Sequence, residues 1–255
     1  MMKKLLSLLL TLALLMTGVA AAAAGMTRQS GDYTYVILED GTAEITKYKG
    51  KTASLDIPAA LDGVPVTGIG NDAFVSYSSL TSITIPDSVT SIGDSAFSYC
   101  GSLTSVTIPD SVAEIGINPF ADCSSMSSIN VSPGNSAFET ADGVLFSKAD
   151  RRLICYPALK AGTEYSIPQG TASIGNNALN GCSSLTSVSI PASVTSIGSW
   201  AFEGCSSLTS VSIPASVTNI GKDAFIDCSG LTLTVVSGSY AEQYAVENNL
   251  AYILQ

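Results

Sequence analysis

Six cysteines are the side chains of this sequence best suited to chemistry, as disulfide partners, zinc ligands or nucleophiles. Five of them occupy one position of a 23-residue repeat, which Tyr77 fills in the first unit: Cys100, Cys123, Cys182, Cys205 and Cys228. A position that accepts Cys or Tyr is typical of an apolar core. Thiols stacked on successive coils point the same way, which disfavours the Cβ geometry of a disulfide. We therefore expect buried free thiols. Zinc is a weaker alternative, since the sequence has no CxxC pair and no histidine.

Groups suited to catalysis or to cation binding are sparse. Without histidine, the usual acid–base group near neutral pH is missing. Gly93-Asp94-Ser95-Ala96 resembles a nucleophile motif, but the other repeats change its middle pair, which indicates a surface turn. Asp87 and Asp110 lie at equivalent positions and could share a cation, although alanine replaces them in later repeats. We expect no catalytic residue, no metal and no cofactor, and hence no enzyme.

The repeat itself predicts the elements that position these side chains. Residues 80–102, 103–125, 185–207 and 208–230 are close copies of one 23-residue unit, and a fixed period of this size is typical of a solenoid. Within one unit, Val106 and Ile108 face one side of a short strand that Pro109 ends. The spacing of Leu103, Val106 and Ile108 resembles the strand of a leucine-rich repeat.

Eight such strand pairs predict the fold class, an α/β but β-dominated leucine-rich repeat solenoid. Its curved parallel sheet has about eight rungs, with short turns or one-turn helices on the convex side. The pairs are Leu55/Ile57, Ile83/Ile85, Val106/Ile108, Ile129/Val131, Tyr165/Ile167, Val188/Ile190, Val211/Ile213 and Leu233/Val235. A second set of equivalent positions predicts a buried column: Phe74, Phe97, Phe120, Leu179, Phe202 and Phe225.

Both ends of such a stack need a cover. Residues 33–48 alternate in polarity and turn at Asp40-Gly41, which predicts an N-terminal β-hairpin cap. Residues 238–249 have the composition of a helix, with Ala241, Tyr244, Ala245 and Asn248 on one face, which predicts a C-terminal cap.

The period breaks twice. A five-residue excess near Leu61 to Pro65 lengthens the first unit, and a larger insert covers residues 132–161. We expect the insert to contain a hairpin that turns near Lys148 to Asp150. It carries four basic residues and three aromatic ones: Lys148, Arg151, Arg152, Lys160, Phe138, Phe146 and Tyr156.

The first residues predict export. Lys3 and Lys4, an apolar run over 5–16 and small residues up to Ala24 have the layout of a signal peptide, and the run is too short for a membrane anchor. Removing this leader leaves nine basic and 21 acidic side chains, a net charge of −12. That charge opposes binding to nucleic acid or anionic lipid. We expect an extracellular protein, not inserted in the membrane after cleavage, with possible non-covalent retention at the cell surface.

The sequence resembles the BspA-type, or Treponema pallidum type, bacterial leucine-rich repeat family. The resemblance covers residues 32–255 and depends on the repeated IPxSVxxIGxxAFxxCxxL pattern, on DGVLF…LICYP in the insert and on GSYAEQYAVENN near residue 250. It implies a β-rich solenoid exported to the cell surface or the medium. It also implies adhesion, including binding to host matrix proteins such as fibronectin and fibrinogen. No binding residues transfer, because the shared motif is the buried frame.

Two places stand out as contact surfaces. The outward strand positions are almost all Ser and Thr and lack the aromatic and Arg anchors that interfaces use, so the predicted concave face is a poor candidate. The basic aromatic insert is a better one. Trp200 occupies a position that is polar in the other units, so we expect it to be at least half exposed. The candidate partner-binding residues are Lys148, Arg151, Arg152, Tyr156 and Trp200.

The resulting hypothesis is a secreted, non-enzymatic protein that binds a protein ligand in adhesion. A structural or self-assembling matrix component and a glycan-binding module are the alternatives. The expected organisation is a signal peptide at 1–24, a hairpin cap at 25–50, repeats at 51–236 and a C-terminal cap at 237–255.

Overall fold

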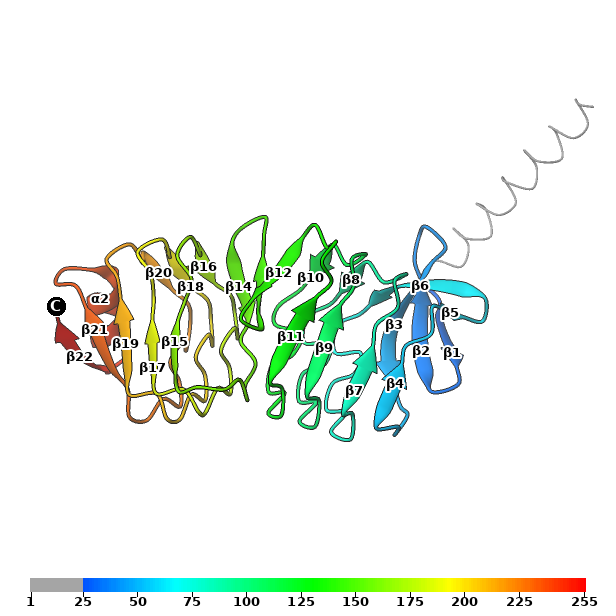
Figure 1. Ribbon diagram of the computed structural model, residues 1–255, viewed down its shortest axis with the longest axis horizontal. Helices are drawn as coiled ribbons and strands as arrows, with labels where there is room; N and C mark the ends of the chain where they lie inside the picture. Colours follow the sequence, from blue (N-terminus) through cyan, green and yellow to red (C-terminus); the bar gives the residue numbers. More distant parts are fainter. Residues whose placement is uncertain (1–24) are drawn as a thin grey trace, which may run out of the picture.

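The computed structural model describes residues 25–255, and the predicted signal peptide lies outside them. The chain winds into an elongated stack of coils (Figure 1). In each regular coil, one strand of three or four residues belongs to a main face. These main strands are β4 (Ser54–Asp56), β7 (Ser82–Thr84), β9 (Ser105–Ile108), β11 (Ser128–Val131), β15 (Glu164–Ser166), β17 (Ser187–Ser189), β19 (Ser210–Ile213) and β21 (Thr232–Val235).

The predicted strand pairs therefore all begin in observed strands, and the fold class is confirmed. Equivalent residues pair in register, such as Val106 with Ile129 and Val188 with Val211. Their inward side chains are buried, except Val131, which is partly buried. A rung alone has too little core to fold, so stacking in register is what removes these side chains from water.

A second face of short parallel strands accompanies the main one. It contains β6 (Val64–Ile69), β8 (Ser91–Ile92), β10 (Glu114–Ile115), β14 (Arg152–Cys155), β16 (Ser173–Ile174), β18 (Ser196–Ile197) and β20 (Asn219–Ile220). The sequence predicts only turns or one-turn helices in these places. After each short strand, the coil returns through turns that stack by main-chain hydrogen bonds, such as Phe97 N–H to Pro119 O at 2.8 Å.

The aromatic column is confirmed. Phe97 stacks on Phe74 with centroids 5.0 Å apart and on Phe120 at 5.6 Å, with the rings within 15° of parallel. Phe202 and Phe225 stack in the same way in the second half, 5.0 Å apart. The six cysteines are buried free thiols, as predicted. The Sγ atoms of the five cysteines at the repeat position contact main-chain carbonyls of the preceding coil, such as Cys123 to Phe97 O at 3.1 Å.

The N-terminal end is closed by strands. The predicted hairpin is present as β2 (Tyr33–Ile37) and β3 (Ala43–Tyr48), and β1 (Thr27–Ser30) adds to β2. The five-residue excess forms a small hairpin between β5 (Ala60–Leu61) and β6, turning at Asp62-Gly63. Tyr33 and Tyr48 pack on the first core.

At the other end, α2 (Tyr240–Glu247) forms within the predicted helical segment, and β22 (Ala251–Leu254) pairs with β21. Ser239 caps the helix by accepting from Glu242 N–H, while the Glu242 carboxylate accepts from Gly238 N–H. Ala241, Tyr244 and Ala245 are buried as predicted. Asn248 is not on the buried face: it is the exposed C-cap, and its amide donates to Tyr244 O.

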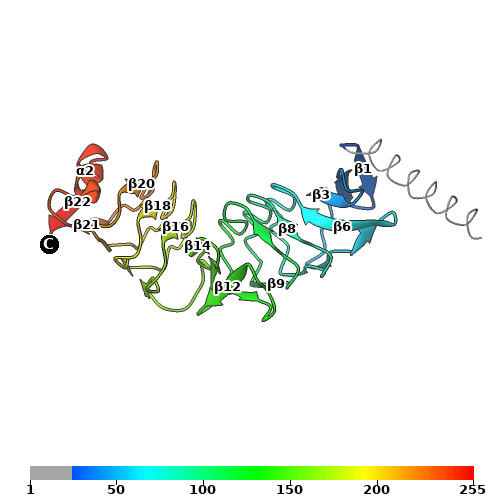
Figure 2. The same cartoon turned by 90° about the horizontal axis from the view of Figure 1, so that it is seen from above.

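The solenoid bends near the insert. Figure 2 shows β8, β16, β18 and β20 on the inner side of the bend, with β9 and β12 (Phe138–Ala141) on the outer side. The sequence predicts the main strands on the concave side, so the direction of this bend differs from the expectation. The insert lies at this bend, where β12 contacts β11.

Candidate binding groove at the joint

The insert forms a wall between two hydrophobic cores. Its strands β12, β13 (Val144–Ser147) and β14 are antiparallel neighbours, and β14 continues in parallel to β16. All four residues of β13 are buried. Leu145 and Ile154 belong to the N-terminal core, whereas Phe146 and Leu153 belong to the C-terminal core. The predicted hairpin near 148–150 therefore exists, but it is built into the solenoid.

In this wall the aromatic residues of the insert are core residues and not surface contacts. Tyr156 is only 3 % exposed, and its ring packs edge-on against Tyr165 at 4.8 Å. Burial raises the pKa of Tyr156 to about 12. Phe138 and Phe146 are buried as well. The assignment of Tyr156 to a partner-binding surface is therefore wrong, since the residue completes the C-terminal core.

The basic residues of the insert do not form one patch. Lys148 is exposed and donates from Nζ to Asn135 O at 2.7 Å. Arg151 lies in the hairpin turn with φ 51° and lines a cavity of about 170 Å³ beside Glu139 and Gln169. Arg152 lines a different cavity, described below.

Trp200 is less exposed than predicted and lies on a separate coil. Its side chain is 38 % exposed, below the half expected. The residue has φ 55°, and the equivalent Asp72, Ser95, Asn177 and Asp223 share this left-handed conformation. Its N–H donates to Lys222 O at 3.1 Å, so the turn is fixed by the stack.

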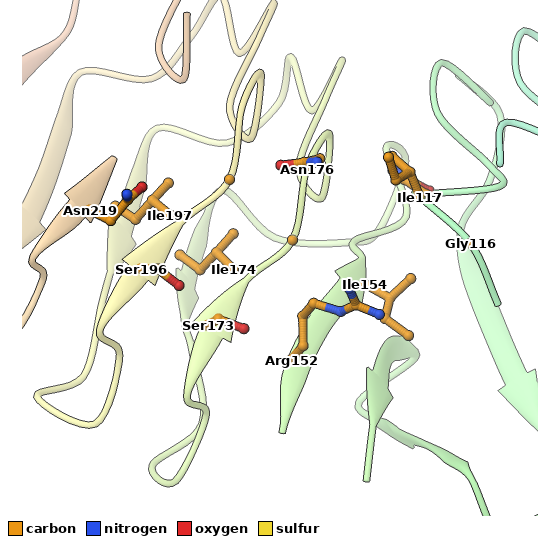
Figure 3. A pocket seen from close by; sticks show the side chains of 13 residues that line it. Gly116, Ile117, Arg152, Ile154, Ser173, Ile174, Asn176, Ser196, Ile197 and Asn219 are labelled. Carbon is orange, nitrogen blue, oxygen red and sulfur yellow. The ribbon is translucent and has the colours of Figure 1, made fainter. Parts of the chain in front are cut away.

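A groove of about 220 Å³ opens where the second face is interrupted between β10 and β14. Gly116 and Ile117 lie on one side, and Arg152 and Ile154 on the other (Figure 3). Polar side chains of the next coils continue the lining: Ser173, Asn176, Ser196 and Asn219. The groove lies in the second face, which is on the inner side of the bend (Figure 2).

Arg152 is the cation of this groove. Figure 3 shows its side chain extending from β14 alongside Ile154. Its Nε atom lies 3.5 Å from Asp150 Oδ2, yet this buried atom has no hydrogen-bond partner. We take the contact as a loose ion pair, because the N–H geometry of a hydrogen bond is not met. The guanidinium can therefore bind a second anionic partner and donate hydrogen bonds to it, for example to a carboxylate.

The groove also borders a sheet edge. Among residues 25–255, β10 pairs with β8 and is the last strand of its sheet. An edge strand presents main-chain donors and acceptors to an added strand. Ile117, immediately after β10, is 39 % exposed and adds an apolar contact. The arrangement suits an extended peptide segment that offers both an apolar and an acidic side chain.

Two asparagines that sequence reasoning missed shape the joint. Asn118 is buried, and its Nδ2 donates to Asn177 O at 2.6 Å while its Oδ1 accepts from Phe120 N–H. Asn135 is also buried and uses its amide for four hydrogen bonds, to Pro109 O and Val112 O and from Ala137 and Phe138 N–H. A signal was present for Asn118, since it precedes Pro119 where other repeats have no proline.

The described part of the chain offers little for other chemistry. Within residues 25–255 no group of three or more Cys, Asp or Glu side chains is placed to hold a metal ion. In the same residues, the search for an apolar helix long enough to cross a bilayer found none. Asp94 and Ser95 lie in a turn, as predicted, and both residues are half-buried.

Short parallel strands, stacked turns and a 23-residue period together define a leucine-rich repeat solenoid. The chain belongs to the BspA-type leucine-rich repeat family, whose model matches residues 48–149 and 155–250 in six copies. This family is associated in general with protein–protein interaction or adhesion, and its fold is typically a non-catalytic binding scaffold.

Solved structures are similar at the level of the fold. A leucine-rich repeat protein from Eubacterium ventriosum has a TM-score of 0.55 at 24% identity, covering 84% of this chain and 73% of that one. The T. pallidum leucine-rich repeat protein has a TM-score of 0.53 at 23% identity, covering 90% and 98%. The search of curated proteins found no match.

Proposed function

We propose that this protein is an exported adhesion protein whose joint groove binds an extended segment of a protein ligand. The observation that carries the proposal is the break between β10 and β14. It places an unpaired sheet edge, an exposed Ile117 and the incompletely paired Arg152 around one cavity. The second-face strands β16 and β18 of the neighbouring regular coils, by contrast, are paired on both edges.

The chemistry of the groove defines the ligand class. A strand added at β10 gains main-chain hydrogen bonds, and its alternate side chains reach the two sides of the groove. An acidic side chain on that strand can take a bidentate pair of hydrogen bonds from Arg152. Without residues 1–24 the chain has a net charge of −12, which opposes binding to a strongly acidic partner as a whole. The ligand is therefore a protein with a local carboxylate rather than a polyanion.

Export and the identity of the ligand are parts of this proposal. The leader-like residues 1–24 support secretion, and the family resemblance supports host extracellular matrix proteins as ligands. Mass measurement of the protein recovered from culture medium tests export. The expected mass is that of a chain that begins near residue 25. Recovery of the protein only inside the cell, with residues 1–24 still attached, would contradict secretion.

Binding is tested by capture of matrix and bacterial surface proteins on the immobilised chain, followed by affinity measurement. Arg152→Ala is expected to weaken binding of a captured protein at least about tenfold, as for an anchoring arginine. Lys222→Ala is the matched control, since Lys222 is a 77 % exposed cation on a distant turn. Equal affinities of the two variants would overturn the groove as the site. Arg151→Ala and Trp200→Ala then test the cavity beside Arg151 and the Trp200 surface.

A further inference from the structure

A second cavity of the insert is separate from the joint groove. It has a volume of about 170 Å³, and none of residues 25–255 lines both cavities. One side is formed by the wall, which contributes Glu139, Phe146 and Arg151. The other side is formed by the turn that follows β15, with Pro168 and Gln169. The cavity therefore lies between the insert and the first coil of the C-terminal half.

The strand register of the wall sets an acidic group beside an apolar floor. Glu139 of β12 lies opposite Phe146 of β13, so the two side chains share one face of the wall. Ala141, two residues after Glu139, lies on the same face. Phe146 is only 5 % exposed and forms the floor, whereas Glu139 is exposed at the rim. The cavity thus combines an apolar base with a carboxylate at its opening.

Hydrogen bonds fix the two sides of the cavity against each other. The main-chain carbonyl of Arg151 accepts from Ala172 N–H at 2.8 Å, which joins the hairpin turn of the wall to the coil after β15. Within that coil, the hydroxyl of Thr171 donates to Pro168 O at 2.8 Å. The cavity is therefore already formed in the free protein, and a ligand does not lose affinity by ordering its walls.

The two charged side chains of the cavity are available to a ligand. Within residues 25–255, no ion pair involves Arg151 or Glu139, although both line the same cavity. The neighbouring Arg152 differs, because it lies near Asp150 and lines the joint groove. A simple anion in the cavity would be repelled by Glu139, and a simple cation by Arg151. A ligand that carries both charges can pair with each of them.

We propose that this cavity binds a free apolar α-amino acid. The carboxylate of the ligand accepts hydrogen bonds from Arg151, and its ammonium group donates to Glu139. Its side chain packs on Phe146 and Pro168, which removes apolar surface from water. The volume of about 170 Å³ is below the range of about 300–1,000 Å³ that is typical of sites for drug-sized ligands. This size favours a single amino acid over a longer molecule.

Calorimetric titration of the chain with free leucine and free phenylalanine tests the ligand class. We expect saturable binding of at least one of them at one site, with a Kd of about 1 mM or tighter. N-acetyl-leucine lacks the ammonium charge and leucinamide lacks the carboxylate, so each is expected to bind at least about tenfold more weakly than leucine. The absence of saturable binding by both amino acids would overturn the proposal. N-acetyl-leucine that binds as tightly as leucine would also overturn it and assign the cavity to the C-terminal residue of a peptide.

Substitutions of the two charged residues test the site. Arg151→Gln and Glu139→Gln are each expected to weaken binding of the amino acid at least about tenfold, and both variants should fold because these side chains are exposed. Arg152→Gln is the matched control and is expected to leave this affinity unchanged, since Arg152 lines the other cavity. Equal affinities of the Arg151 and Arg152 variants would place the amino acid elsewhere and overturn the proposal. Neither result depends on a protein ligand in the joint groove.

Discussion

The side-chain amide of Asn118 donates a 2.6 Å hydrogen bond to the main-chain carbonyl of Asn177, 59 residues further along the chain. This bond crosses the joint, because Asn118 follows β10 and Asn177 follows β16. Asn118 does not share the left-handed conformation of the equivalent residues. The following Pro119 favours extended backbone at position 118, which accounts for the difference. The Asn118-Pro119 pair, which differs from the other repeats, thus provides a hydrogen bond between the two halves of the solenoid.

Asn118→Ala is expected to lower the free energy of unfolding by about 1–3 kcal/mol, because it removes the hydrogen bond to Asn177 O and leaves the buried Phe120 N–H without a partner. Asn176→Ala is the control: Asn176 also accepts a main-chain hydrogen bond, from Ser199 N–H, but it is exposed to water. Denaturant unfolding followed by circular dichroism measures both. Losses of the same size in the two variants would contradict a structural role specific to the joint.

Phe202→Ala is expected to cost about 3–5 kcal/mol of stability, as for other core aromatics. The side chain is fully buried and stacks on Phe225. Tyr99→Ala removes a 58 % exposed aromatic ring and is expected to change stability little. Thermal unfolding with the two variants side by side checks this, and a Phe202 variant as stable as the Tyr99 variant would show that the column does not stabilise the fold.

The thiols are expected to be inaccessible in the folded protein. All six cysteines are buried and free, and burial raises the pKa of Cys155 to about 12. A thiol reagent at neutral pH should therefore label almost none of them before unfolding and all six in denaturant. Fewer than six labelled thiols in denaturant without reductant would reveal disulfides instead.

Asp122 is expected to make stability depend on pH. Burial raises the pKa of this carboxyl, so the folded chain holds its proton more tightly than the unfolded chain does. The contribution of Asp122 to stability is therefore full in acid and is lost as pH rises through the raised pKa. Asp122→Asn should stabilise the protein at pH 7 by less than about 1 kcal/mol, and not at pH 3, because water screens a half-buried group.

Asparagine also tolerates the left-handed backbone of this position, where φ is 56°. Urea unfolding at the two pH values measures the effect. A variant that is equally stabilised at both pH values would show that the carboxylate charge is not the cause.

The regular part of the fold could be predicted because its information is local and repeated. Each inward position recurs every 23 residues, so the columns of Val106, Phe97 and Cys123 follow from aligning the repeats. The short strands of the second face could not be predicted in the same way. Strands such as Ser91–Ile92 have two residues, and their pairing depends on the stacking of whole coils.

The candidate site was less predictable. Arg152 was correctly placed in the insert, but the groove around it is formed by Ile117 and Asn118, which lie far away in the sequence. Tyr156 was misplaced because the insert was expected to present its basic and aromatic residues as a contact surface. In the structure its alternate side chains serve two cores, a role that no sequence period reveals.

Hydrogen exchange measured with and without a captured protein ligand tests the central claim most directly. If the ligand adds at the edge of β10 and pairs with Arg152, amide exchange should slow in residues 113–118 and 151–155, on both sides of the groove. Slowing confined to main strands such as β17 and β19, with residues 113–118 unchanged, would contradict the claim and place binding on the serine- and threonine-lined face.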